Sequence, residues 1–247
     1  MPAAFCGVFG LKPRFGLLPK RGQGFPGTDA AEVELAVIGP LARTAIDLDV
    51  ALGVLAGPDI DDAAAYRLAL PAPRRSRLAA CRLFALDAHP RARTDAVIRE
   101  AIAALCDDAA RAGAEVARQT PLLPDLDAAH DQYLAMLGTI MTRGAPNVKH
   151  VISAHEGFFL LDQQMRLRRQ WRALVERFDA VIARAFGCVA YPHVDTPDMR
   201  TSTLTIDGEP AVYGQQVAWP GVATSPACRR RWRRSARRAK ACQSASR

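Results

Sequence analysis

The sequence has few of the residues that make up a self-contained catalytic centre or a path through a membrane. It holds four Lys and seven Ser in 247 residues, and no G-x-S-x-G motif that would expose a nucleophilic serine. No run approaches about 18 consecutive apolar residues, which excludes a membrane-spanning helix. The apolar start of the chain has no basic residue before it and a Lys after it, the wrong order for a secretory signal. We therefore expect a cytoplasmic protein with no membrane partner.

Residue patterns typical of metal and cofactor sites are also missing. The six Cys are scattered without a C-x-x-C pair, so we interpret them as reduced, small hydrophobic residues. The acidic stretch 59–62 begins like a calcium loop, but Ala64 replaces the required Gly and no Glu closes the loop. His150 and His155 do not share a helix face, and the glycines of 22–27 lack a strand-to-helix context. The sequence predicts no metal ligand and no cofactor.

The overall composition is that of an ordinary globular protein. Apolar residues make up 49% and charged residues 23% of the chain, which excludes collagen and disorder throughout. The net charge of +8 is misleading, because nine of the 33 Lys and Arg lie in 225–247, which has no Asp or Glu. Residues 1–224 are close to neutral, so we expect no nucleic-acid partner. The pattern predicts one domain over 1–224 and a basic, disordered tail over 225–247.

Hydrophobic periodicity predicts alternating strands and helices. A T-x-x-D start at Thr44 predicts a helix over 44–56, and an S-x-x-E capping box at Ser153 predicts a longer one over 154–177. Thr94 is expected to cap a helix whose apolar face includes Leu105. The other predicted elements are a short strand near 5–8, strands at 81–86, 114–117 and 179–183, and a helix over 127–142. The strand–helix–strand unit favours parallel pairing, and the order of elements indicates an α/β fold.

Two segments resemble the amidase signature family. The string PAAFCGVFGLKPRFG, from Pro2 to Gly16, is similar to the family's P-A-x-x-x-G-x-x-G-x-K-P. The stretch 38–59 looks like its G-P-[ML]-[AT]-R-[ST]-x-x-D-L segment. The matching residues are Pro2, Gly7, Gly10, Lys12, Pro13, Gly39, Pro40, Arg43, Thr44, Asp47 and Leu48. Weaker likenesses at 167–183 and 213–224 extend the resemblance over about residues 2–224.

The resemblance implies a fold and a chemistry. The fold would be part of an α/β/α sandwich, a mixed β-sheet covered by helices. Family members hydrolyse or transfer carbon–nitrogen amide bonds through a Ser nucleophile, with a second Ser on a cis peptide and a Lys base. The implied partner is a small-molecule amide substrate, and a homo-oligomer is left open.

The departures from the family pattern concern the catalytic residues. In the family, the nucleophile lies in a Gly-Gly-Ser-x-Arg segment just before the position of Pro2, and the other two residues lie further upstream. Lys12 matches the structural Lys of the motif and does not replace them. We therefore predict that this chain contains no catalytic residue. It would be the C-terminal half of an amidase, truncated before the nucleophile and inactive alone. Arg184 stands where a Pro is usual, and its charge would need a partner if buried.

The tail departs as well. After G-V-A-T the family continues with a hydrophobic segment rich in Gly and Pro that ends in G-V-Q. With GC-rich codons, a shifted frame that begins at the third base of the Ser225 codon reads PGLPATVAPIGAPSEGLPIGVQ. The sequence therefore predicts a frameshift after about Thr224, and a tail without a selected function.

Three other functions remain open at this stage. The chain could be a non-catalytic binding protein derived from an amidase, or a transamidase component that works on charged tRNA. It could also bind nucleic acid through the Arg-rich tail.

Overall fold

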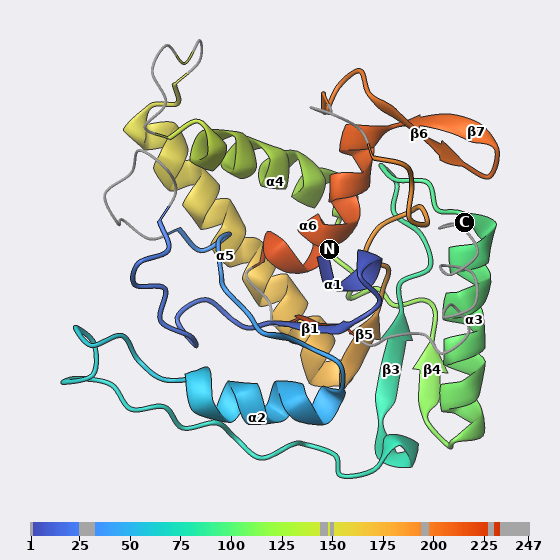
Figure 1. The fold of residues 1–247 in the computed structure, drawn as a ribbon, viewed down its shortest axis with the longest axis horizontal. Coiled ribbons are helices and arrows are strands. Elements are labelled where there is room, and N and C mark those ends of the chain that lie inside the picture. The colour runs from blue at the N-terminus through green and yellow to red at the C-terminus, as the bar shows by residue number, and fades with distance from the viewer. Residues whose placement is uncertain are drawn as a thin grey trace.

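The computed structural model describes residues 2–24, 33–143, 148, 151–193, 198–226 and 230–232, and contains both helices and strands. Figure 1 shows their arrangement. The helices are α1 (Pro2–Phe5), α2 (Ala45–Leu55), α3 (Ala96–Arg111), α4 (Leu126–Met141), α5 (Ala154–Arg177) and α6 (Ala218–Thr224), with 3-10 turns η1 (Leu78–Ala80) and η2 (Tyr213–Val217). The strands are β1 (Phe9–Lys12), β2 (Leu41–Ala42), β3 (Arg82–Ala85), β4 (Glu115–Ala117), β5 (Ala180–Ile182), β6 (Thr203–Ile206), β7 (Glu209–Val212) and β8 (Arg230–Trp232).

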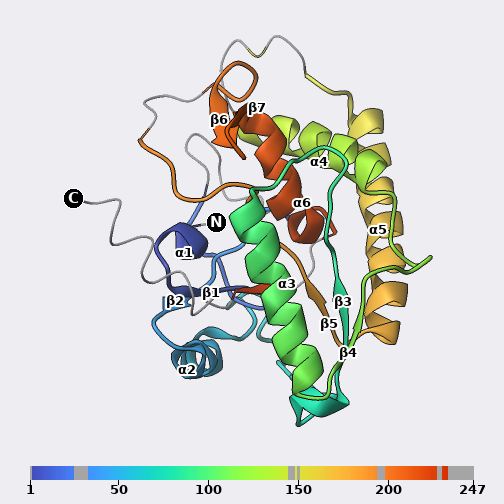
Figure 2. The same cartoon turned by 90° about the vertical axis from the view of Figure 1, so that its right-hand side faces the viewer.

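A parallel sheet of order β4-β3-β5 forms the middle of three layers. Helix α3 lies on one side of this sheet and α5 on the other (Figure 2). Successive side chains of β3 face opposite layers: Leu83 is buried with Ala109 of α3, and Phe84 with Trp171 of α5. The predicted α/β class and the parallel pairing around α3 are thus confirmed.

The other described strands form antiparallel sheets. One has the order β2-β1-β8, and the second is the hairpin β6-β7. The short strand predicted near 5–8 is wrong: these residues include the end of α1, and the strand begins at Phe9. Pro2 suits a first helical position, and Gly7, with a φ of 65°, supplies the left-handed backbone that ends the turn.

The tail contributes strand β8, which runs antiparallel to β1. Ser225 and Pro226, just before it, are buried. The expected disorder is therefore not found at these residues. Residues 227–229 and 233–247 lie outside the described part of the chain, and for them disorder stays a prediction.

Two helix starts form as their sequences predict. The Thr44 hydroxyl accepts a hydrogen bond from the Asp47 N–H at 3.0 Å. At α5, the Ser153 hydroxyl accepts from the Glu156 N–H, and the Glu156 carboxylate accepts from the Ser153 N–H, which completes a capping box. Both caps satisfy backbone donors that a helix start leaves without partners.

The start and buried face of α3 differ from the prediction. Asp95, not Thr94, is its N-cap residue, and the Asp95 carboxylate instead accepts the N–H groups of Val189 and Asp207. The buried stripe passes through Cys106, while Leu105 is exposed. Tertiary hydrogen bonds to the β6-β7 hairpin and to the segment after β5 thus outweigh the local capping preference.

Gly39 explains why the second amidase-like motif begins with Gly-Pro. A Cβ atom at Gly39 would lie 1.9 Å from the Leu11 carbonyl oxygen. The absence of a side chain lets this segment lie against β1, where the Leu11 N–H donates to the Pro40 carbonyl oxygen at 3.1 Å. Leu48 and Leu52 of α2 then pack with Leu11 in one buried cluster.

In the part of the chain that the structure describes, no helix combines the length and the apolar character needed to cross a bilayer.

Candidate functional site

An aromatic cluster connects the first residues of the chain to its last third. The Phe5 ring meets Phe186 edge-on at 5.4 Å between centroids, and Tyr191 at 5.8 Å. Tyr213, at the start of η2, lies 6.2 Å from Tyr191. Burial, followed by the hydrogen bond with Tyr213, raises the pKa of Tyr191 far above its usual range, so this phenol stays protonated at neutral pH. Pro2 lies one helical turn from Phe5, about 5 Å along the axis.

A cleft of about 450 Å³ opens where β3 ends, and its walls are residues 87–94, Arg99 and Gln215. Ligands of open α/β sheets bind beyond the carboxyl ends of the strands, so the cleft lies where a binding site is expected. Three arginines line it, but Arg99 is held by Asp207 at 2.8 Å and Arg91 by two carboxylates of α4. Much of the positive charge of the cleft is therefore already paired.

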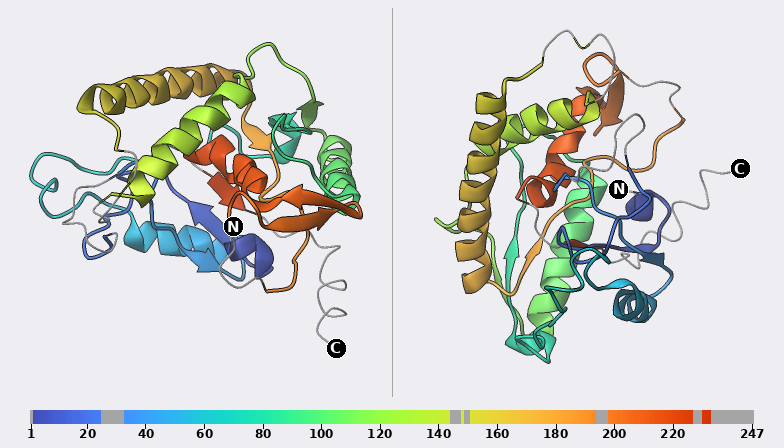
Figure 3. Two further views of the ribbon diagram at one scale, coloured as in Figure 1. Left: turned by 90° about the horizontal axis from the view of Figure 1, so that it is seen from above. Right: turned by 90° about the vertical axis from the view of Figure 1, so that its left-hand side faces the viewer.

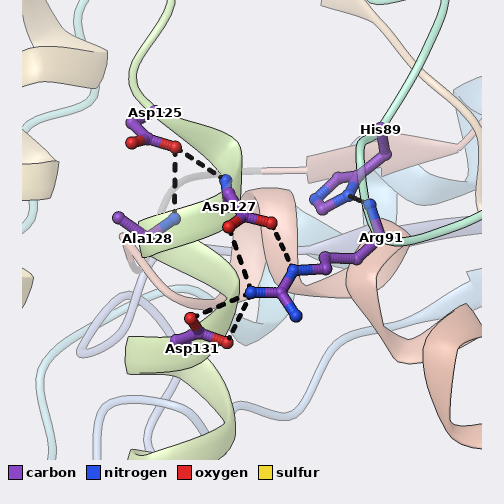
Figure 4. Close-up of polar contacts among 6 residues, drawn as sticks. All are labelled: His89, Arg91, Asp125, Asp127, Ala128 and Asp131. Carbon is purple, nitrogen blue, oxygen red and sulfur yellow. Dashed lines mark hydrogen bonds and ion pairs between the residues drawn. The ribbon is translucent and has the colours of Figure 1, made fainter.

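Arg91 fixes the wall of this cleft to α4 (Figure 4). Its guanidinium donates to both carboxylate oxygens of Asp127 and to Asp131, at 3.1 Å for the nearer Asp131 oxygen. The Asp125 carboxylate accepts from the N–H groups of Asp127 and Ala128, which caps the same helix. The hydrogen bond from Arg91 lowers the pKa of Asp127. The network orients the loop after β3, although exposed pairs of this kind add little stability.

Two buried histidines pack together here: His89 in the loop after β3, and His130 on α4. His89 and His130 meet edge-on at 5.9 Å, and His89 also meets Trp219 at 5.6 Å. The His89 Nδ1 atom accepts the Arg91 N–H at 3.2 Å, which requires a neutral ring with its proton on Nε2. A cavity of about 10 Å³ beside the pair has room for about one water molecule. Burial is the main cause that lowers the pKa of both rings, that of His89 to about 4.

The buried His89 makes the stability of the chain depend on pH. The ring takes up a proton near pH 6.5 when unfolded but only near pH 4 when folded. Between these values the unfolded state binds more protons, so the free energy of unfolding should fall as the pH is lowered, by up to about 3 kcal/mol from His89. Urea titrations at pH 4.5 to 7.5 measure this loss. His89→Gln should flatten the profile, and His155→Gln, at an exposed position, should not. A profile unchanged by His89→Gln would contradict the prediction.

Arg184 lies two residues after the end of β5 and is 3% exposed. Its Nη1 donates to the Leu86 carbonyl oxygen at 2.9 Å, and its guanidinium carbon lies 5.0 Å from the centroid of the Trp219 ring. Burial lowers the pKa of Arg184. The charge that replaces the usual Pro is thus buried and compensated by a carbonyl dipole and an aromatic face.

The motifs that the sequence excluded as sites have local structural roles. Asp59 and Asp61 hold Arg21, whose hydrogen bond lowers the pKa of Asp59. His155 is exposed, and His150 lies outside the described residues. Within the described ranges, no group of three or more Cys, His, Asp and Glu could hold a metal ion. Lys12 is half-buried in β1.

Sequence reasoning missed the cleft and its histidine pair. His89 and His130 are isolated in the sequence, and no spacing rule connects a loop residue to a helix 41 positions later. The position of Asp87 and His89 directly after a predicted buried strand was the available signal, because the carboxyl ends of parallel strands meet at one edge of a sheet.

Comparison with known sequences identifies a family and relatives that match part of the chain. A sequence profile of the family named Amidase matches residues 1–141. A glutamyl-tRNA(Gln) amidotransferase subunit from Solidesulfovibrio magneticus is 37% identical over 120 residues, which are 47% of this chain and 24% of the relative. The subunit of the same name from Thermosynechococcus vestitus is 46% identical over 70 residues, 28% of this chain and 14% of its own length.

Comparison with solved structures extends the likeness in fold to nearly the whole chain. A fatty acid amide hydrolase matches 92% of this chain with a TM-score of 0.66 and 17% identity. The glutamyl-tRNA(Gln) amidotransferase subunit of Thermotoga maritima matches 92% with a TM-score of 0.64 and 16% identity. The matches cover 41% and 51% of those two chains, so this chain spans about half the length of the proteins that share its fold.

Proposed function

The chain belongs to the amidase family, and from this premise we propose that it forms part of an enzyme that hydrolyses carbon–nitrogen amide bonds of small molecules. The nucleophilic Ser, the bridging Ser and the Lys of that enzyme would come from residues outside these 247. This chain would supply the segment after the nucleophile and the walls around the reacting amide.

The observation that carries the proposal is the position of α1. The family motif places the nucleophile a few residues before Pro2, and α1 brings Phe5 into the aromatic cluster with Phe186 and Tyr191. Phe5, Tyr191 and Tyr213 are all partly exposed. A serine a few residues before Pro2 would enter the fold next to this aromatic cluster, which suits an apolar group beside the amide carbonyl.

The test uses the completed polypeptide. It consists of this chain preceded by an amidase half that carries the Gly-Gly-Ser-x-Arg segment and followed by the frame-restored segment PGLPATVAPIGAPSEGLPIGVQ in place of the tail. We expect it to hydrolyse aryl or aliphatic amides, and we expect the 247-residue chain to show no turnover, because it lacks the nucleophile and its base. Ser→Ala in the added Gly-Gly-Ser-x-Arg segment should abolish hydrolysis. Turnover by the 247-residue chain, or none by the completed polypeptide on a broad amide panel, would contradict the proposal.

A second candidate is a transamidase component that works on charged tRNA. It is favoured by the names of the sequence relatives, which are subunits of a glutamyl-tRNA(Gln) amidotransferase. Conversion of Glu-tRNA(Gln) to Gln-tRNA(Gln) by the completed polypeptide, with little hydrolysis of simple amides, would select this function.

A cytoplasmic location is part of the proposal. Cys6, Cys81, Cys106 and Cys188, the cysteines among the described residues, are free thiols, as is usual in a reducing compartment.

A further inference from the structure

Helix α2 has apolar side chains on both of its long sides. Leu48 and Leu52 are buried on the inner side, in the cluster with Leu11 of β1. Ile46, Val50 and Val54 repeat at intervals of four residues on the outer side, and are exposed by 75%, 64% and 80%. We call these three residues the outer stripe. Asp47 and Asp49 are the only charged residues of the helix.

A helix that is apolar all round is typical of a protein interior rather than a surface. Yet α2 lies at the border of the molecule in Figure 1, and the two views of Figure 3 agree. Leu41 of β2, the strand in contact with α2, is also exposed, by 55%. The outer stripe therefore belongs to a surface that needs a partner.

Two kinds of partner fit this surface poorly. A lipid surface is disfavoured because the helix carries two aspartates and no basic residue, whereas helices that lie on membranes are rich in Lys and Arg. A second copy docked through α2 alone would bury too little. An 11-residue helix is about 16 Å long, and a stripe about 10 Å wide along it is far smaller than the roughly 800 Å² per partner of a stable interface.

The comparison with solved structures indicates which partner would cover the outer stripe. Solved chains that match 92% of this chain are about twice its length, so about half of each such fold has no counterpart in these residues. We infer that the outer stripe of α2 is a docking surface for a polypeptide that carries this other half of the amidase fold. The inference rests on the proposed function, because it assumes that the two halves act together.

The test measures binding of the 247-residue chain to a separately produced amidase half that carries the Gly-Gly-Ser-x-Arg segment. Calorimetry and size-exclusion chromatography should detect a complex with one copy of each. Val50→Asp should weaken binding at least tenfold, because it places a charge in the interface. Val97→Asp is the matched control, since Val97 is a 55% exposed apolar residue on α3. Circular dichroism should show equal helix content in both variants. Equal affinity of both variants, or no complex, would overturn the inference.

A second measurement applies even if the separate halves aggregate. Val50→Cys and Val97→Cys are introduced one at a time into the completed polypeptide, and alkylation of each new thiol is followed by mass spectrometry. The thiol at position 50 should react at least tenfold more slowly than the one at position 97. Equal rates would contradict docking at α2, and so would Val50-dependent dimers of the 247-residue chain alone.

These outcomes separate the inference from the proposed function. A complex that depends on Val50 but hydrolyses no amide supports the docking surface and contradicts the enzymatic proposal. Amide hydrolysis by the completed polypeptide that Val50→Asp leaves unchanged supports the enzymatic proposal and contradicts the docking surface.

Discussion

Replacing the Arg-rich tail by the frame-restored segment should switch amide hydrolysis on. In the completed polypeptide, we expect the version that keeps residues 225–247 to be inactive, and the frame-restored version to be faster by on the order of 10³-fold or more. Strand β8 shows that the chain after Pro226 reaches the edge of β1. A hydrophobic segment there can supply a strand and bury apolar area, worth roughly 25 cal/mol per Å², where the tail brings charge. Amide turnover of the two versions measures the effect.

Cutting the 247-residue chain after Pro226 provides the control. The cut keeps the buried Ser225 and Pro226, whose carbonyl oxygens accept hydrogen bonds from Gln164 and Arg168. Stability should change little, because among the described residues the cut removes only strand β8 and its pairing with β1. If the Arg-rich tail were instead a functional basic element, the intact chain would bind RNA with a steep salt dependence. The cut after Pro226 would then abolish RNA binding. RNA binding at physiological salt, with no hydrolysis by the frame-restored version, would refute the frameshift proposal.

The second large effect concerns Gly39. Gly39→Ala should destabilise the chain by about 3 kcal/mol, because the new Cβ would lie 1.9 Å from the Leu11 carbonyl oxygen and 3.0 Å from Pro13 Cδ. The Leu11 carbonyl is backbone, and Pro13 Cδ belongs to a buried ring that is closed onto the backbone, so neither neighbour can move cheaply. The hydrogen bond between Leu11 and Pro40 should be lost with the displacement of β1. Urea unfolding and hydrogen exchange at the Leu11 amide measure the two effects.

Gly53→Ala is the matched control. Gly53 lies exposed in α2 with no atom near the position of a Cβ, so the change should stabilise the helix by roughly 0.5–1 kcal/mol. The two Gly→Ala changes should therefore shift stability in opposite directions. Equal changes in the free energy of unfolding of the two variants would mean that Gly39 does not make the close contact with β1.

Local sequence signals predicted the elements that are stabilised locally. The capping box at Ser153 and the periodicity that follows give α5 at Ala154–Arg177, and the apolar run at 81–86 gives β3. The cap and the hydrogen bonds of α5 lie within a few residues, whereas β3 pairs with distant β4 and β5 and was visible only as a short apolar run. The β6-β7 hairpin was missed although its signal was present: Asp207 and Gly208, both with positive φ, form the Asp-Gly turn between alternating residues.

The sequence by itself determined the family, through the two motifs around Pro2 and Gly39, and the α/β order of elements. The tertiary structure alone decided which distant residues meet. The carboxylate of Asp95, the N-cap residue of α3, binds the hairpin, Arg184 is buried against Trp219, and the outer stripe of α2 is exposed. Each of these depends on the energy of contacts between segments far apart in the chain, where the burial of one side chain is fixed by the packing of another. Periodicity shows that a helix has an apolar face, but only the packed fold shows whether that face is covered.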